Sequence, residues 1–373
     1  MKIAHCQIVL GIAGSEKYLL DLLPTLNKGS DLEVLFFALV PKNQLGAEKE
    51  FVQQMTERGI EVITIPFSGL GLNGARGIKR AVNERSIDVL HTHLLHADFM
   101  AAQARRLMKC KVIQVSTKHG YEESYNNAYG FDPAFKKKNK YWRIAKWSEK
   151  GVRKSFAVSK GLQNLYTGLG ICKEDRLDVI YHGFDFDIAP SETKENHPPK
   201  LVMVGRLTAF KGHRYAIEAC KELANSGLSF EFDIVGSGEL KDELEAQVKD
   251  LGLTDQIRFL GFQKDAAERM SAADLVLIPS VAEGFGVVVL EAMAAKTPII
   301  AFDVPALNEL IDHDQTGILV KPYDTSAYAG AIQNLIENRE KSSRITFAAH
   351  KKLTSYFSLR RMSEETAKFY RSL

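Results

Sequence analysis

Apolar runs of about six to ten residues alternate with segments of helical spacing along the whole chain. Such runs are typical of parallel strands, which are buried on both faces and joined by crossover helices. In the first half we predict strands at residues 2–10, 32–40, 61–66, 88–93, 111–120 and 154–159. In the second half we predict strands at residues 200–206, 230–238, 257–262, 275–280, 298–303 and 317–322. The pattern predicts an α/β protein with two doubly wound, Rossmann-like sheets.

A polar, proline-rich stretch, APSETKENHPP at residues 189–199, separates the two series of strands and is predicted to be a linker. A chain of 373 residues is long enough for two domains, each with its own core. We expect domains at residues 1–188 and 200–345, and then a helical segment, 346–373, that crosses back to the first domain. Ligands of such sheets bind at the carboxyl ends of the strands, so the chemistry is expected there, in a central cleft.

The composition, 45% hydrophobic and 25% charged residues, is that of a soluble globular protein. The four cysteines are Cys6, Cys110, Cys172 and Cys220. They form no C-x-x-C pair, which indicates buried thiols in a reducing cytosol rather than a zinc site or a disulfide framework. His5 and Gln7 interrupt the apolar start of the chain, which we interpret as a strand and not a signal peptide. No uncharged apolar run approaches the roughly 18 to 20 residues that cross a bilayer, so any membrane contact is expected to be peripheral.

Charge is distributed unevenly between the halves. Residues 1–190 carry 27 Lys and Arg against 20 Asp and Glu, a balance of +7, and the remainder carries 22 against 26, a balance of −4. So modest an excess argues against a nucleic-acid-binding protein. Nine cations of the first half lie at residues 136–154, among Tyr141, Trp142 and Trp147. We expect this segment either to dock on an anionic membrane surface or to bury its aromatic face on the sheet.

The segment LVMVGRLTAFKGHRYAIEAC predicts a strand, a loop and a helix. The loop contains Gly205, Arg206, Lys211 and Gly212. Two cations beside the unpaired amides of a helix start suit an anionic group such as a diphosphate. It is not a Walker loop, because Lys211 precedes Gly212 and no Ser or Thr follows. The alternative is a solvated loop with two surface charges.

A second turn of this type passes through Gly236 and Gly238. Lys241 stands where a dinucleotide fingerprint has its third glycine, which disfavours a nicotinamide dehydrogenase. A pair of glycines at a tight turn is mostly structural.

The segment VAEGFGVVVLEAMA places Glu283 and Glu291 on either side of a glycine turn in apolar surroundings. Gly284 and Gly286 are expected to let a ligand approach the backbone where a helix presents its free N–H groups. Glu291 is expected about a turn and a half inside that helix. A carboxylate is a bidentate acceptor that suits the vicinal hydroxyls of a sugar or a ribose, whereas the alternative for each glutamate is a solvated helix face.

Two further patterns could hold a metal ion. DVLHTHLLHAD offers His91, His93 and His96, and GFDFD contains Asp185 and Asp187 as a D-x-D pair. The histidines have no nearby cysteine or acidic cluster, and the D-x-D lies in a turn before the linker. We therefore expect strand-end contacts and packing, and no metal.

These motifs together resemble a known family. VGRLTAFKGH, VGSGEL, FLGF, SAADLVLIPSVAEGFGVVVLEAMA and NELIDHDQTGILV occur in the order and spacing of the retaining glycosyltransferases of family 4, which have the GT-B fold. The resemblance covers nearly the whole chain and is most specific in the second domain. It implies a metal-independent enzyme without a cofactor that moves a hexose from a UDP- or GDP-linked sugar to a hydroxyl acceptor.

The resemblance also implies roles for individual residues. Arg206 and Lys211 would hold the donor diphosphate. Glu283 and the backbone of residues 285–286 would contact the donor sugar, and Glu291 would bind the ribose hydroxyls. The complete donor site would comprise Gly14, Gly205, Arg206, Lys211, Gly236, Glu283, Gly284, Phe285, Gly286, Val287 and Glu291.

In the first domain the resemblance is looser. GIAGSEKYLLDL resembles the glycine-rich first loop of the family, with Ala13 before Gly14 where a second glycine is common. TKHG places His119 at a strand end, where the family often has a histidine beside the reacting sugar. The catalytic candidates are then Glu283, His119, Arg206 and Lys211. The first domain would bind the acceptor, a glycan or a lipid-linked envelope precursor, in the cytoplasm or on the inner face of the cell membrane.

Three other functions fit parts of the pattern. A GT-B enzyme of another reaction, such as a sugar-nucleotide epimerase, would share the phosphate site but should lack the E-G-F-G signature. A non-catalytic module would bind the sugar nucleotide without turnover. A Rossmann oxidoreductase would need the missing third glycine.

Overall fold

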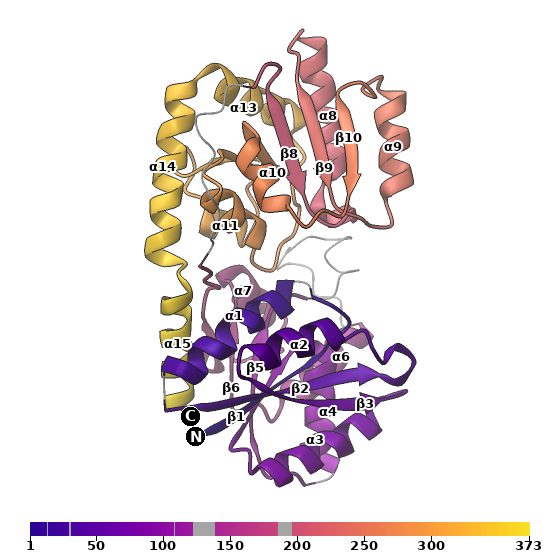
Figure 1. Cartoon of the computed structure of the whole chain (residues 1–373), viewed down its shortest axis with the longest axis vertical. Coiled ribbons are helices and arrows are strands. Elements are labelled where there is room, and N and C mark those ends of the chain that lie inside the picture. The colour runs from indigo at the N-terminus through magenta and orange to yellow at the C-terminus, as the bar shows by residue number, and fades with distance from the viewer. Residues whose placement is uncertain (13, 30, 108, 122–138, 186–195) are drawn as a thin grey trace. The chain divides into compact units, whose positions relative to one another are not determined.

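The computed structural model describes residues 1–12, 14–29, 31–107, 109–121, 139–185 and 196–373 (Figure 1). These residues form two compact units. The first unit contains residues 1–121, 139–184 and 358–373, and the second contains residue 185 and residues 196–357. Most of the expected linker, residues 189–195, lies outside the described residues.

The first unit is built on a parallel sheet of seven strands in the order β3-β2-β1-β4-β5-β6-β7. The strands are β1 (Lys2–Ile8), β2 (Glu33–Pro41), β3 (Glu61–Phe67), β4 (Val89–His93), β5 (Ile113–Lys118), β6 (Lys154–Ala157) and β7 (Leu177–Val179). The six expected strands are confirmed. The edge strand β7 was not predicted, because three residues with an aspartate in the middle carry no apolar run.

Helices cover both faces of this sheet. They are α1 (Gly14–Gly29), α2 (Lys49–Glu57), α3 (Leu72–Arg85), α4 (Leu94–Leu107), α6 (Lys140–Glu149), α7 (Lys160–Gly168) and α15 (Leu359–Arg371), with short 3-10 turns η1 (Lys42–Gln44) and η2 (Glu174–Arg176). Successive strand residues point to opposite faces, so Ile3 belongs to a core with α1, α2 and α15, and Ala4 to a core with α3 and α4. Figure 1 shows α1 and α2 on the opposite side of the strands from α3 and α4.

The second unit contains a parallel sheet of six strands in the order β10-β9-β8-β11-β12-β13. The strands are β8 (Lys200–Val204), β9 (Glu231–Val235), β10 (Ile257–Gly261), β11 (Leu275–Ile278), β12 (Ile299–Phe302) and β13 (Ile318–Val320), all of them predicted. The order of the strands reverses between β8 and β11: β9 and β10 follow on the side of β8, and β12 and β13 follow on the side of β11. Doubly wound sheets bind ligands at such a reversal, because the crossover helices diverge there and leave the strand ends open.

Seven helices are described in the second unit, together with the 3-10 turn η3 (Ala209–Lys211). They are α8 (His213–Asn225), α9 (Lys241–Asp250), α10 (Ala266–Ala272), α11 (Val287–Ala294), α12 (Leu307–Leu310), α13 (Thr325–Glu337) and α14 (Arg339–Tyr356). Asp324 and Asn338 accept N-cap hydrogen bonds at α13 and α14, as expected of short polar side chains at helix starts. None of the helices in the described part of the chain is long and apolar enough to cross a membrane.

The basic aromatic segment is described from residue 139 onward, where it forms α6. Its three large aromatic side chains contact residues of their own unit. Tyr141 packs against Tyr121, Trp142 donates a hydrogen bond to the Leu169 carbonyl at 2.8 Å, and Trp147 packs against Phe99. The four cysteines are buried free thiols, as predicted.

Candidate functional site

Three loops of the second unit lie side by side at the carboxyl ends of β9, β8 and β11. Backbone hydrogen bonds join them. Gly205 N donates to Val235 O at 2.9 Å, and Val281 N donates to Phe210 O at 2.8 Å. The loop that carries the predicted cations is therefore held on both sides, by the loop after β9 and by the loop that carries Glu283.

Two glycines allow this close approach. A Cβ on Gly212, whose φ is +77°, would lie 1.9 Å from the carbonyl oxygen of Pro279. A Cβ on Gly236, whose φ is +146°, would lie 1.9 Å from the carbonyl oxygen of Gly205. Both positions thus require glycine for loop-to-loop packing. For Gly236 this agrees with the structural interpretation of the glycine pair.

Lys211 and Glu283 meet where the loops after β8 and β11 adjoin. Lys211 Nζ lies 2.6 Å from Glu283 Oε1, and the side chains are only 18% and 8% exposed. The Arg206 guanidinium carbon and Lys211 Nζ each lie 5.6 Å from the ring centroid of Phe210. Three of the four catalytic candidates therefore lie together in the second unit. An ammonium has three donors, so Lys211 can bind a phosphate oxygen while it keeps Glu283.

The start of α11 adjoins these groups in sequence. The helix begins at Val287, directly after Gly286, whose φ of +97° suits glycine. The first N–H groups of a helix have no partner within it and favour an anion or a sugar oxygen. Phe285 is buried, and its ring centroid lies 6.2 Å from that of Phe357, so its ring belongs to the core of the second unit. Glu291, four residues after Val287, lies on the same helix face.

The remaining two candidates, Gly14 and His119, belong to the first unit. Gly14 is the first residue of α1, and a Cβ there would meet no atom within 4 Å. His119 directly follows β5, and its Nε2 lies 2.9 Å from Nδ1 of His93. Burial lowers the pKa of His119 to about 3, so the ring is neutral near pH 7. It is therefore a neutral hydrogen-bonding group, not a cation.

Sequence reasoning missed several polar residues near these candidates. His213, the first residue of α8, is buried, and neither ring nitrogen has a hydrogen-bond partner among the described residues. Burial, and then the Lys211 charge, lower its pKa to about 3. Its position directly after the Lys211–Gly212 loop was the available signal. In the first unit the missed residues are His5 and Tyr370, which no local motif marks.

The two metal patterns fare differently. His91 and His93 do lie close together, but the third member of their group is His5, and His96 is exposed on α4. Of the D-x-D pair, Asp185 is described and Asp187 lies outside the described residues, so the expectation of no metal there stays a prediction.

Comparisons with known proteins follow the division into two units. Residues 12–188 match the model for Glycosyltransferase Family 4, and residues 185–352 match the model for Glycosyl transferases group 1. The alpha-D-kanosaminyltransferase of Streptomyces kanamyceticus is 31% identical over 247 residues, 62% of this chain and 64% of that protein. The amylovoran biosynthesis glycosyltransferase AmsK of Erwinia amylovora is 27% identical over 277 residues, 71% of this chain and 66% of that protein. The matched part spans about two thirds of the length of each of these relatives.

The fold is shared with solved glycosyltransferase structures. Anabaena HepE in complex with UDP-glucose superposes with a TM-score of 0.80 at 22% identity over the whole of both chains. The sucrose-phosphate synthase of Thermosynechococcus elongatus gives 0.79 at 16% identity, over 100% of this chain and 99% of that one. These likenesses confirm the GT-B fold. Since the two family models together cover residues 12–352, the chain belongs to glycosyltransferase family 4.

Proposed function

We propose that the chain is a retaining glycosyltransferase that moves a hexose from a nucleotide-diphosphate sugar to a hydroxyl acceptor. The contact between Lys211 and Glu283 carries the proposal, because it joins a phosphate-binding cation and a sugar-binding carboxylate at one point. UDP is the first nucleotide to test, since HepE was solved with UDP-glucose. GDP remains the second.

The chemistry assigns each group a step. Negative charge builds on the diphosphate as the glycosidic bond breaks, and Arg206 and Lys211 stabilise it as it leaves. The N–H groups at the start of α11 and the Glu283 carboxylate hold the sugar that is transferred. Glu291 accepts hydrogen bonds from the ribose hydroxyls. The acceptor hydroxyl enters on the face that the diphosphate leaves and passes its proton to the departing phosphate oxygen, so the anomeric configuration is retained. The neutral ring of His119 orients the sugar or the acceptor by hydrogen bonding.

The first unit supplies the acceptor side in this proposal. The open space beside Gly14 and the strand end at His119 are where a glycan or a lipid-linked envelope precursor would bind. The exposed cations of α6, Lys140 and Arg143, add an anionic membrane surface as a partner. Since the aromatic rings of α6 contact their own unit, this docking is electrostatic, on the cytoplasmic face of the membrane.

One experiment separates this function from its alternatives. The purified chain is titrated calorimetrically with UDP, GDP and ADP, and the sugars of the winning nucleotide are offered with candidate acceptors. Proton NMR of the first product should show the anomeric configuration of the donor, at a rate unchanged by chelator. An inverted product, or a rate abolished by chelator and restored by manganese, contradicts the mechanism. Epimerised nucleotide sugar, or binding without any turnover, points to the alternative GT-B enzyme or to a binding module.

A further inference from the structure

Five polar side chains of the first sheet share one face. In the parallel registers His5 pairs with His91, and His93 pairs with Thr117. Residues two apart on a strand point to the same face, and paired residues of neighbouring strands do so too. His5, His91, His93 and Thr117 therefore lie on the face that α1 and α15 cover, and His119 continues this row beyond β5.

Hydrogen bonds join these side chains into one chain, to which α15 contributes Tyr370. The successive contacts are His119 Nε2 to His93 Nδ1 at 2.9 Å, His93 Nε2 to His5 Nδ1 at 2.9 Å, His5 Nε2 to the Tyr370 hydroxyl at 2.8 Å, that hydroxyl to His91 Nδ1 at 2.5 Å, and His91 Nε2 to Thr117 Oγ1 at 2.7 Å. His5, His91 and His93 are completely buried, whereas His119 is partly exposed. The chain thus runs from the sheet interior to the strand end where the candidate site residue lies.

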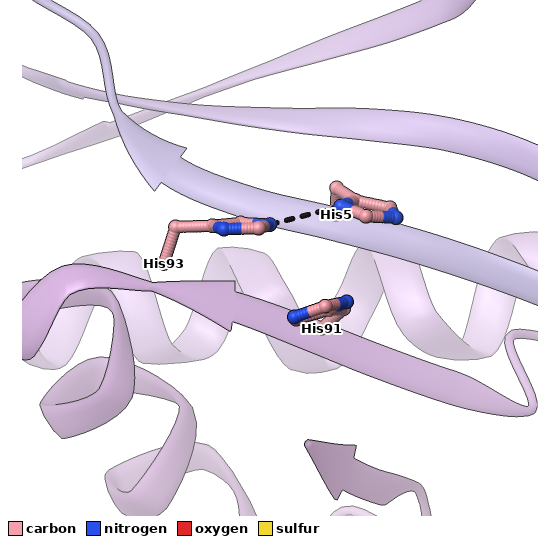
Figure 2. Close-up of side chains that lie close together, drawn as sticks. All are labelled: His5, His91 and His93. Carbon is pink, nitrogen blue, oxygen red and sulfur yellow. Dashed lines mark hydrogen bonds between the residues drawn. The ribbon is translucent and has the colours of Figure 1, made fainter. Parts of the chain in front are cut away.

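The ring geometry favours a hydrogen-bond chain over a metal site. The His5 and His93 rings are inclined by only 14° with centroids 5.1 Å apart, and Figure 2 shows them edge to edge with the bonded nitrogens facing each other. Ring lone pairs lie in the ring plane, so these two nitrogens point at one another and not at a shared third point. Both nitrogens of His91 likewise have partners, Tyr370 and Thr117.

The histidines of this hydrogen-bond chain are neutral. Burial lowers the pKa of His5 to about 3 and holds those of His91 and His93 well below the ordinary value. A neutral imidazole has one N–H and one bare nitrogen. Each link then takes one proton, and the direction of one link fixes the direction of the next. Tyr370 donates on one side and accepts on the other, so it passes this order on.

We propose that the buried chain holds His119 in a single tautomer, and that His93, His5 and Tyr370 are positioning residues for it. The order of protons decides whether the outer nitrogen of His119, Nδ1, offers a proton or a lone pair. In water a neutral histidine exchanges between both forms, so a fixed form gives the strand end one hydrogen-bonding character. The tautomer itself is independent of the proposed function, and only its effect on sugar transfer rests on it.

Nitrogen NMR of histidine-labelled full-length protein tests this inference. In the unaltered protein, the nitrogen chemical shifts of His119 should be those of one tautomer. Scalar couplings should be seen across the two hydrogen bonds between histidines. Tyr370→Phe keeps the ring and removes a hydroxyl three hydrogen bonds away, and it should shift both nitrogens of His119 toward the other form. Phe369→Leu, which loosens the same helix but removes no hydrogen-bonding group, and Tyr328→Phe, which removes a buried hydroxyl in the second unit, should leave them unchanged.

The outcomes are separable. A mixture of tautomers in the unaltered chain, or His119 shifts indifferent to Tyr370→Phe, overturns the inference. So does stoichiometric zinc binding that moves the His5 and His93 signals. If the chain transfers sugar, Tyr370→Phe should lower kcat by about fivefold at constant donor KM, which a merely looser fold would not do selectively. If no transfer is found, the proposed function fails while the tautomer result stands.

Discussion

Lys211 and Glu283 form an ion pair across two loops, with 2.6 Å between Nζ and Oε1 and both side chains largely shielded from water. The pair joins the segment after β8 to the segment after β11, 72 positions apart in the sequence. A phosphate that binds Lys211 must share it with the carboxylate, so the two residues are expected to act together.

Lys211→Ala should weaken binding of the nucleoside diphosphate by about 1.5 to 3 kcal/mol, the value of a hydrogen bond to a charged group. Arg206→Ala should act in the same direction. Isothermal titration calorimetry measures both effects. Lys241→Ala, on the exposed surface of α9, is the matched control and should bind as the unaltered chain does. A double variant, Arg206→Ala with Lys211→Ala, that keeps full affinity would remove these residues from the diphosphate site.

Glu283→Gln should separate turnover from affinity. The amide keeps the shape of the side chain but removes the charge that Lys211 neutralises, so diphosphate affinity should hold or rise. The rate of transfer should fall on the order of 100-fold, because the transferred sugar loses its contact with the Glu283 carboxylate. Steady-state kinetics beside calorimetry measures the two effects. Affinity and turnover falling together would instead assign Glu283 to folding or to nucleotide binding.

Gly212→Ala should destabilise the second unit well beyond the cost of a left-handed backbone. The new Cβ would lie 1.9 Å from the Pro279 carbonyl oxygen, so the loops must move apart. Gly252→Ala is the matched control, with a similar φ of +69° and no atom within 4 Å, and should cost about 1 to 2 kcal/mol. Hydrogen exchange of peptides from residues 200–357 reads the second unit alone. Equal protection in both variants would mean that the two loops are not tightly packed.

The first unit should lose stability as the pH falls below about 6.5. His5 and His119 have pKa values of about 3 in the folded chain, so between about pH 6.5 and 3 only the unfolded chain takes up their protons. The stabilisation is complete above this window. Within it, the free energy of unfolding falls by up to about 1.4 kcal/mol per pH unit for each of the two groups.

Urea unfolding at pH 7 and pH 5 measures this effect. Both tryptophans of the chain, Trp142 and Trp147, belong to the first unit, so their fluorescence reports that unit alone. Equal free energies of unfolding at the two pH values would show that the buried rings are already protonated, or are reached by water.

Anionic vesicles should bind the protein through α6, and the binding should weaken with salt. Each exposed cation near the surface contributes about 1 kcal/mol, so Lys140→Glu with Arg143→Glu should reduce cosedimentation strongly. The same charge reversal at Lys42 and Arg80, also exposed in the first unit, is the control. Neutral vesicles should bind nothing. If the same amount of protein stays in the supernatant with all vesicles, the membrane is not a partner and a soluble acceptor is favoured.

Local pattern predicted most of the architecture, because strands buried on both faces must be apolar regardless of their neighbours. Short motifs also mark the cation loop and Glu283, whose role in binding a donor stays a prediction. Local pattern could not predict the partners of Lys211 or His119, since these depend on register between strands far apart in sequence. The sequence groups His93 with His96, which lies three positions further along the chain, whereas the hydrogen-bond partner of His93 is His5 on the adjacent strand. The same limit concealed Tyr370, which joins the histidines from a helix 365 positions away from His5.

The placement of α15 in the first unit has a consequence for the order of synthesis. Met362, Phe369 and Tyr370 complete the core formed by β1, α1 and α2, yet they leave the ribosome only after all of residues 196–357. The first unit to be translated is therefore the last whose core can close. Until then the face of its sheet with the buried histidines lacks one of its covering helices, and the second unit has the opportunity to fold first.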